Sequence, residues 1–568
     1  MLAAALRPSP IARMTVAAPR TMSPPALDFP PRPCYDGDMN GLKRFPIGLQ
    51  DFAQIRRNGY YYVDKTAIIH EMVSAGRVYF LSRPRRFGKS LLVSTLKCYF
   101  EGRKDLFEGL AMEGFEKEWK VHPVFHVSFS ITKYNDLNSL QITLNNILSE
   151  WEKTYDVTNT SGNEWGNRFA AVIKAAHDKT GEEPVVLVDE YDAPLLDTMD
   201  DPEMQKKLKM EMRKFFSPLK DLGGILRFVF LTGITRFSQL SIFSELNNLN
   251  VITMNDRYAA ICGITSEELL SQMQPEIQAL ADRHGLTYEG AVEALRKKYD
   301  GYHFTRRSPD VYNPFSLIRS LTDGELDNYW FSTGTPTVLT QLIKKYDIDP
   351  DELDRGFPAT ADMFDAPAEE AGDPVPMLYQ SGYVTIKDYD GYSYTLGFPN
   401  EEVRYGFLHC LLPYYAAKTV SQNDTFLLKF SRFLREGNLE DAMTLMRSFF
   451  SSIPYNAEKQ DENHYKTVFF LIARLCTPFG VRTEEASAAG RSDMVVETQD
   501  AVYVFEFKLD GTVEEALAQI DSKGYLIPYE ASVGADGRPK KLFKIGASFD
   551  AQTRTLGGWK VVEAEGHL

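Results

Sequence analysis

The chain has 568 residues, and this length predicts about three or four domains rather than a single core. Its composition, 43% hydrophobic and 25% charged, is ordinary for a soluble globular protein, and its apolar runs are shorter than the roughly 18 to 20 residues of a membrane span. A net charge of −15 excludes attraction of nucleic acid by the surface as a whole, so any such contact requires a local basic patch.

Five cysteines are scattered along the chain, and no two have the spacing of metal ligands. We therefore expect free thiols, a cytoplasmic location and no membrane partner. Residues 1–44 are low in complexity, with eight prolines before Met39, and predict a disordered tail. Two alternatives stay open: an arginine-rich transit peptide, or upstream sequence before a true start at Met39 instead of Met1.

Residues 45–264 alternate short apolar runs with longer stretches of helical spacing. Unbroken hydrophobic runs are typical of strands that are buried on both faces of a parallel sheet. We therefore predict a doubly wound α/β domain. The expected strands are Val78–Leu81, Val124–Phe129, Val185–Val188 and Leu226–Leu231, and the expected helices are Ser90–Phe100, Leu137–Trp151, Arg168–Lys179 and Glu203–Phe216.

The first expected strand leads into the segment RPRRFGKS, residues 83–90. Its last three residues, Gly88-Lys89-Ser90, match the end of the phosphate-binding pattern G-x-x-x-x-G-K-[ST], but Arg83 replaces the first glycine of that pattern. A strand, a turn and a helix that opens with Gly-Lys-Ser is the context in which backbone N–H groups and the helix dipole hold phosphate. We expect Lys89 to reach the β- and γ-phosphates of ATP and Ser90 to bind Mg²⁺.

Polar residues also follow two later strands. Asp189 and Glu190 end the run VVLV, and acids at the carboxyl end of a buried parallel strand lie where α/β sheets bind ligands. Asp189 suits the magnesium shell, and Glu190 suits a base that orients the attacking water. Thr235 and Arg236, after the fourth strand, are candidates to contact the γ-phosphate.

The middle of the chain is expected to be helical in residues 265–335, with helices at Ser266–Gln272 and Tyr288–Tyr299, and mixed in residues 336–456. We expect residues 265–335 to form a helical, lid-like region next to the α/β domain. Ala359–Pro376, rich in Asp, Glu, Ala and Pro, predicts a surface loop.

Several of these stretches resemble the AAA-ATPase-like proteins common in bacteria, whose phosphate loop also reads RPRRFGKS. The resemblance implies a P-loop NTPase fold and makes the missing glycine a family trait. We assign nucleotide contacts to Arg83, Arg86, Phe87, Gly88, Lys89, Ser90 and Leu91; for the two arginines, solvated turn positions are an equal alternative. The other stretches that carry the resemblance are FPIGLQDF, YYVDKT, YDGYHF, YNPFSL, YWFSTGTP and LYQSGYVTI.

The carboxyl-terminal part, residues 457–568, begins with an expected helix, Tyr465–Cys476, and continues as a short α/β unit. Within it, residues 490–508 read as a hairpin that turns at Gln499-Asp500 and pairs residues whose numbers sum to 999. This register sets Asp493 opposite Glu506 and places Lys508 on the same face. Two carboxylates can hold Mg²⁺ or Mn²⁺, and the lysine can orient a water; a cross-strand salt bridge is the alternative.

Asp493 and the triplet Glu506-Phe507-Lys508 resemble the core of PD-(D/E)XK nucleases, which the AAA-ATPase-like family characteristically carries at its carboxyl end. The resemblance implies a restriction-endonuclease-like fold and places Gln519 and Tyr525 beside the site. Glu462, on the preceding helix, is a further candidate ligand, with a solvated acid at the helix start as the alternative. Thr512 and Glu515 predict a capping box for the next helix. From Asp461 onward the chain has 17 acidic and 12 basic side chains, which argues against a general basic footprint, although Lys540, Lys541 and Lys544 cluster.

The two resemblances together imply an ATP-hydrolysing protein with a metal-dependent nuclease-like domain that acts on nucleic acid, and we expect ATP to control that domain. Two alternatives stay open. One is a nucleotide-dependent scaffold whose carboxyl-terminal domain binds without cutting, and the other is a signalling protein whose output is oligomerisation on ATP.

Overall fold

The computed structural model describes residues 44–564 except 131, 159–163, 237–248, 332–338, 340–341, 343–344, 347, 368–371, 417–418, 454–461, 477–480, 488–489, 535–536, 551 and 554. The tail expected over residues 1–44 therefore lies almost wholly outside the described residues. Among the helices that are described, none combines the length and the apolar character needed to cross a bilayer.

The first region is built on a five-stranded sheet with the order β2-β3-β4-β1-β5, in which every pair is parallel. Every residue of β1, β3 and β4 is buried, as expected of strands covered on both faces. The predicted strands are thus confirmed to within two residues, whereas the short β5 has no apolar run that could have predicted it. The strands are β1 (Val78–Ser82), β2 (Val124–Ser128), β3 (Val185–Asp189), β4 (Phe228–Gly233) and β5 (Asn250–Val251).

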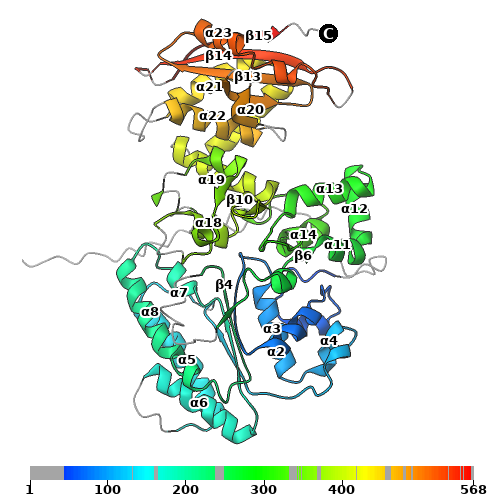
Figure 1. The fold of residues 1–568 in the computed structure, drawn as a ribbon, viewed down its shortest axis with the longest axis vertical. Helices are drawn as coiled ribbons and strands as arrows, with labels where there is room; N and C mark the ends of the chain where they lie inside the picture. The colour runs from blue at the N-terminus through cyan, green and yellow to red at the C-terminus, as the bar shows by residue number, and fades with distance from the viewer. Residues whose placement is uncertain are drawn as a thin grey trace, which may run out of the picture. The chain divides into compact units, whose positions relative to one another are not determined.

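Helices cover both faces of this sheet, which confirms the doubly wound fold (Figure 1). On one side lie α5 (Leu137–Thr154), α6 (Trp165–Thr180) and α8 (Pro202–Phe216), and on the other lie α2 (Thr66–Ala75), α3 (Lys89–Phe100) and α4 (Ala111–Phe115). The remaining helices of the region are short: α1 (Phe52–Arg57), α7 (Ala193–Leu196) and α9 (Pro218–Asp221).

A helical group with a core of its own follows. It contains β6 (Ile264–Thr265), α11 (Ser266–Gln272), α12 (Gln274–His284), α13 (Tyr288–Tyr299), β7 (Val311–Tyr312) and α14 (Pro314–Asp323), so both helices predicted here are confirmed. Helix α11 begins at a capping box of Thr265 and Glu268, which satisfies two backbone N–H groups at its first turn.

The next segment corrects one expectation. The surface loop predicted at Ala359–Pro376 is wrong for its described ends, because α17 (Ala361–Phe364) and the start of α18 (Val375–Gln380) lie within it and Phe364 is fully buried against the rings of Tyr379 and Tyr394. The other elements are α16 (Pro350–Arg355), β8 (Phe357–Ala359), β9 (Thr385–Tyr389), β10 (Tyr394–Gly397), α19 (Glu401–Ala416), α20 (Val420–Arg435) and α21 (Leu439–Ser451).

The carboxyl-terminal region holds a second five-stranded sheet, in the order β11-β12-β13-β14-β15. Only the β13–β14 pair is parallel, so the sheet is mixed, as a restriction-endonuclease-like α/β unit requires. Helix α23 packs on one face of this sheet and α22 on the other (Figure 1). Phe469 of α22 contacts Phe505 and Phe507 of β13. The elements are α22 (Glu462–Cys476), β11 (Val481–Ser487), β12 (Gly490–Glu497), β13 (Ala501–Leu509), α23 (Val513–Lys523), β14 (Lys541–Asp550) and β15 (Thr555–Ala564).

Candidate functional sites

The loop between β1 and α3 has the backbone form that an anion site at a helix start requires. Gly88 precedes the helix with φ 90°, and a Cβ added there would meet nothing within 4 Å. Arg86 also has a positive φ, 69°, so the turn is tight. The loop therefore leads directly into the N–H groups at the amino-terminal end of α3.

Lys89 is buried, and its ammonium donates hydrogen bonds to the carbonyl oxygens of Arg83, at 2.9 Å, and Pro84, at 3.0 Å. Burial lowers the pKa of Lys89, while the carboxylates of Asp189, Asp192 and Glu190 act in the opposite direction. The charge of the ammonium is therefore offset by acids at and just after the end of β3, although β4 separates β1 from β3 in the sheet.

Of the two acids at the end of β3, Asp189 is buried and Glu190 is half-buried. Asp189 is 5% exposed, and its Oδ1 is buried without a hydrogen-bond partner among the described residues. Glu190 has φ 51°, and burial together with the charge of Asp189 raises its pKa. A buried carboxylate oxygen with an unused lone pair is costly in a resting protein and suits a position that binds a cation.

Asp192 is a residue that the sequence reasoning missed. It is fully buried, and its Oδ2 accepts hydrogen bonds from the backbone N–H groups of Ile234, at 2.9 Å, and Thr235, at 2.7 Å, and from the Thr235 hydroxyl, at 2.8 Å. It therefore ties the segment after β3 to the segment after β4. Its position three residues after Asp189, in the same acidic run, was the available signal.

Thr235 and Arg236 are committed to protein partners in this structure. The Thr235 hydroxyl donates to Asp192, and the Arg236 guanidinium forms an ion pair with Asp365 while its backbone N–H donates to Gln380 Oε1 at 2.6 Å. Contact with a γ-phosphate stays a prediction, and for Arg236 it requires the pair with Asp365 to open.

The two loop arginines differ. Arg83 is 1% exposed; its guanidinium donates to the carbonyl oxygens of Ser82, Thr253, Tyr258 and Ala259 and lies 4.3 Å from the ring centroid of Phe304. The solvated alternative is therefore wrong for Arg83, and the side chain braces the loop from inside. Arg86 is exposed and lies 4.6 Å over the ring of Phe315, where its charge remains beside the loop.

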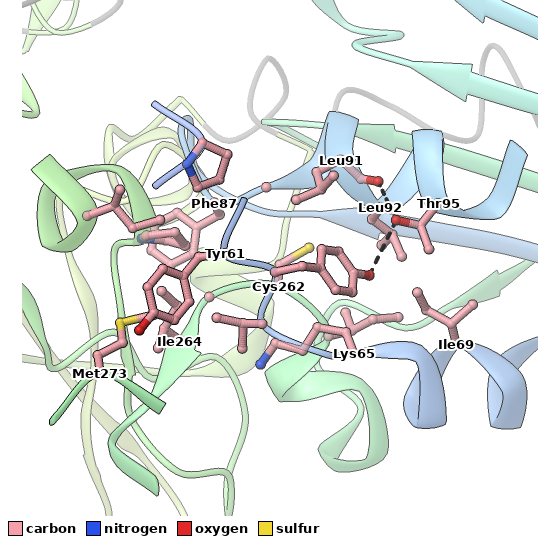
Figure 2. A pocket seen from close by; sticks show the side chains of 18 residues that line it. Tyr61, Lys65, Ile69, Phe87, Leu91, Leu92, Thr95, Cys262, Ile264 and Met273 are labelled. Atoms are coloured by element: carbon pink, nitrogen blue, oxygen red, sulfur yellow. Dashed lines mark hydrogen bonds between the residues drawn. The ribbon is translucent and has the colours of Figure 1, made fainter. Parts of the chain in front are cut away.

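A cavity of about 90 Å³ lies beside the start of α3 (Figure 2). It is larger than the roughly 10–15 Å³ that one water requires, and its lining is mostly apolar. Gly88 and Leu91 reach it from the loop and α3, and Ile264 reaches it from β6. Two polar groups of the lining are already paired: Thr95 donates to the Leu91 carbonyl at 2.9 Å, and the Lys65 ammonium contacts both oxygens of Glu268 at 2.5 and 2.6 Å.

In the carboxyl-terminal region the predicted hairpin register is confirmed: Met494 pairs with Phe505 and Val495 with Val504. Asp493 Oδ2 accepts the backbone N–H of Phe507 at 2.7 Å, so its carboxylate is directed at the end of β13. Glu506 is 2% exposed, its Oε1 accepts from the Lys508 ammonium at 2.9 Å, and its Oε2 is buried without a partner among the described residues. Burial, followed by the charge of Asp493, raises the pKa of Glu506.

Two neighbours complete this cluster. Gln519, on α23, accepts a hydrogen bond from the Lys508 ammonium at 2.8 Å. Its amide nitrogen in turn donates to the Tyr525 hydroxyl oxygen at 3.5 Å. The capping box of Thr512 and Glu515 is confirmed. The side chain of Glu462 lies outside the described residues.

Lys466, on α22, was missed by the sequence reasoning. Its ammonium lies 2.8 Å from Asp493 Oδ1. Nothing in the motif signals this residue, because the contact depends on how α22 packs on the sheet.

The three clustered lysines do not form a free basic patch. Lys540 contacts Glu497 at 2.9 Å, Lys541 lies 3.8 Å from Glu563, and Lys544 contacts Asp521 at 2.6 Å. Among the described residues, groups of three or more His, Cys, Asp or Glu side chains arranged to hold a metal are not found. Asp493 and Glu506 are, among the described residues, the carboxylates at the hairpin that a cation could use.

Known families match two parts of the chain. Residues 46–243 match the family described as Predicted AAA-ATPase, and residues 460–559 match the PD-(D/E)XK nuclease superfamily. A protein of Azotobacter chroococcum mcd 1, described as "Uncharacterized protein in vnfD 5'region", is 35% identical over 540 residues, which cover 92% of this chain and 99% of that protein. The similarity therefore extends through the helical and mixed regions between the two matched parts.

Proposed function

Because the chain belongs to the family of AAA-ATPase-like proteins with a carboxyl-terminal PD-(D/E)XK nuclease superfamily domain, we propose that it hydrolyses ATP at the β1–α3 loop and cleaves nucleic acid at the β12–β13 hairpin. One observation carries both halves. Each site combines a lysine with a buried carboxylate oxygen that lacks a partner among the described residues: Lys89 with Asp189, and Lys508 with Glu506.

At the first site, the triphosphate of ATP would lie at the amino-terminal end of α3. Lys89 would exchange the carbonyl oxygens of Arg83 and Pro84 for phosphate oxygens, which are stronger acceptors because they are charged. Ser90 and Asp189 would hold Mg²⁺, and Glu190 would orient the attacking water as a general base. The adenine ring of ATP would enter the apolar cavity beside Gly88, where burial of a flat ring favours binding.

At the second site, Asp493 and Glu506 would hold Mg²⁺, or Mn²⁺ in its place. The cation supplies Lewis-acid polarisation of the phosphodiester when it is bound. Lys508, fixed between Glu506 and Gln519, is positioned to orient a water or to stabilise negative charge as it develops.

The first half is tested by ATP turnover. Lys89→Ala should abolish it, because the variant removes the charge at the β- and γ-phosphates. Lys97→Ala changes a half-exposed lysine on the same helix and should leave turnover unchanged. Equal turnover in both variants would remove the ATPase proposal.

The second half is tested by Mn²⁺-dependent nicking of plasmid DNA and cleavage of single-stranded RNA. Glu506→Gln should abolish cleavage, whereas Glu563→Gln, at an exposed acid on β15 of the same domain, should not. A wild-type protein that binds nucleic acid but cleaves neither substrate would instead favour the scaffold function.

We also propose that ATP controls the nuclease through the mixed region. A Cβ built on Gly382 would lie 2.6 Å from Pro84 Cβ, so the phosphate loop contacts the segment that leads into β9. Arg236, after β4, contacts Asp365 and Gln380 of the same region. Cleavage should then respond to ATP in the wild type and not in Lys89→Ala; identical responses would end the coupling proposal.

A further inference from the structure

We propose that Lys466 is the internal counter-ion of the nuclease-like site, and that a divalent cation binds there by displacing its ammonium from Asp493. The inference rests on the metal-dependent function proposed above and adds a residue that the PD-(D/E)XK motif does not contain. Lys466 lies in α22, outside the hairpin that holds the motif.

The contact is close and sheltered. Lys466 Nζ lies 2.8 Å from Asp493 Oδ1, and the two side chains are 23% and 11% exposed. An ion pair with this little solvent around it is weakly screened, so its strength exceeds that of a surface pair. The ammonium therefore competes with any other cation for the same carboxylate.

Packing fixes the helix that carries the lysine. The ring of Tyr465 stacks on Phe549 with centroids 4.5 Å apart, and Phe469 contacts Phe505 and Phe507 at 5.1 and 5.0 Å. The backbone of Lys466 is thus held against the sheet, while its own stem has four rotatable bonds. The ammonium can leave Asp493 without any movement of α22.

The two oxygens of Asp493 have different partners. Oδ2 accepts the backbone N–H of Phe507 at 2.7 Å, which is fixed by the strand, whereas Oδ1 faces the movable ammonium of Lys466. A metal can therefore bind Oδ1 by displacing only a side-chain ammonium, whereas binding Oδ2 would break a hydrogen bond to the strand backbone. Glu506 Oε2, buried without a partner among the described residues, is the matching oxygen on β13.

The charges support displacement over simple addition. The described ion pairs of the site set two carboxylates, Asp493 and Glu506, against two ammonium groups, Lys466 and Lys508. A divalent cation added beside both ammonium groups would meet their positive charge in a sheltered place, which is unfavourable. Removal of one ammonium from the cluster reduces this repulsion, and Lys508 is held in place by Gln519 as well as by Glu506.

The test is the affinity of the full-length protein for Mn²⁺, measured by calorimetry without nucleotide or nucleic acid. Lys466→Met and Lys466→Gln remove the charge at nearly constant length, and each should bind Mn²⁺ about tenfold more tightly, the equivalent of one charge-assisted hydrogen bond. Lys466→Arg keeps the charge and should bind as the wild type does. Lys544→Met, which breaks an ion pair with Asp521 in the same domain, is the matched control and should also bind as the wild type does.

Thermal unfolding supplies a readout that does not depend on activity. In EDTA, Lys466→Met and Lys466→Gln should unfold at a lower temperature than the wild type, because Asp493 loses its counter-ion, and saturating Mn²⁺ should remove most of the difference. A wild type that binds Mn²⁺ with unchanged affinity in both neutral variants would overturn this inference alone. If neither the wild type nor the neutral variants bind Mn²⁺, the metal-dependent function fails, and this inference fails with it.

Discussion

The two candidate sites use similar groups but are assembled in different ways. At the hairpin, Asp493 and Glu506 come together because two adjacent strands pair in a register set by one short turn. At the phosphate loop, Lys89 and Asp189 lie a hundred residues apart: Lys89 begins α3, which follows β1, and Asp189 ends β3, with β4 between the two strands. The arrangement of the ATP site therefore depends on the order of the whole sheet, whereas the Asp493–Glu506 pair depends on the register of two adjacent strands.

The largest expected effect is the loss of ATP turnover on substitution of the proposed general base, Glu190. Glu190→Gln should lower ATP turnover by about 100-fold, the size of a lost general base, while the Kd for ATP changes little. Since burial and Asp189 raise the pKa of Glu190, turnover in the wild type should fall on acidification at a pH above the ordinary carboxyl range, as the base becomes protonated. Steady-state rates across pH, with binding of a fluorescent ATP analogue, measure both effects.

Substitutions at Asp192 and Thr235 test the contact that joins the segments after β3 and β4 beside the ATP site. Asp192→Asn should destabilise the fold by about 2 kcal/mol, because a buried acceptor of three hydrogen bonds is weakened. Thr235→Val removes one of those bonds and should cost about 1 kcal/mol. Urea unfolding measures both; equal and negligible effects would contradict the role assigned to Asp192. The nicking activity of either folded variant should be unchanged.

The cavity beside α3 gives a smaller effect on the same site. Ile318, on α14, lines it, and Ile318→Trp should raise the KM for ATP by about tenfold with little change in kcat, since the larger ring occupies the volume proposed for the base. Ile318→Val is the control and should behave as the wild type does. A lower kcat at constant KM would place the effect outside the cavity.

The smallest effect concerns a buried acid that belongs to neither site. Burial raises the pKa of Glu402 to about 7, and its Oε1 accepts the N–H of Trp330 at 2.8 Å. Because the folded-state pKa lies above the unfolded one, the folded state holds more protons, and stability falls as pH rises between about 4.5 and 7.

Glu402→Gln should therefore match the wild type in Tm at pH 5 and exceed it at pH 8. The Gln side chain has the same shape and can accept the Trp330 N–H, so the charge is the main difference. Differential scanning calorimetry at the two pH values checks this, and a variant that is less stable at pH 8 would refute it.

The sequence predicted those features that depend on neighbouring residues. The buried runs of β1, β3 and β4 have no polar interruption, and the hairpin register followed from the turn at Gln499-Asp500. In both cases the residues that form the structure lie within a short stretch of chain, so a local pattern indicates the structure. The capping box at Thr512 is of the same kind.

The features that could not be predicted depend on distant contacts. Arg83 is buried because the carbonyl oxygens of residues 253, 258 and 259 surround its guanidinium, and no local pattern distinguishes it from the exposed Arg86. Asp192 and Lys466 likewise acquire their roles from segments that are far away along the chain. Phe364 lies within an acidic, Pro-containing stretch; it ends the short helix α17 and is buried against Tyr379, a contact that the local sequence does not indicate.

ATP turnover and Mn²⁺-dependent nicking without nucleotide, measured on the same preparations of wild type, Lys89→Ala and Glu506→Gln, test the separation of the two sites most directly. We expect Lys89→Ala to lose ATP turnover and keep nicking, and Glu506→Gln to show the reverse. Retention of ATP turnover in Lys89→Ala, or of nicking in Glu506→Gln, would contradict the assignment of that site.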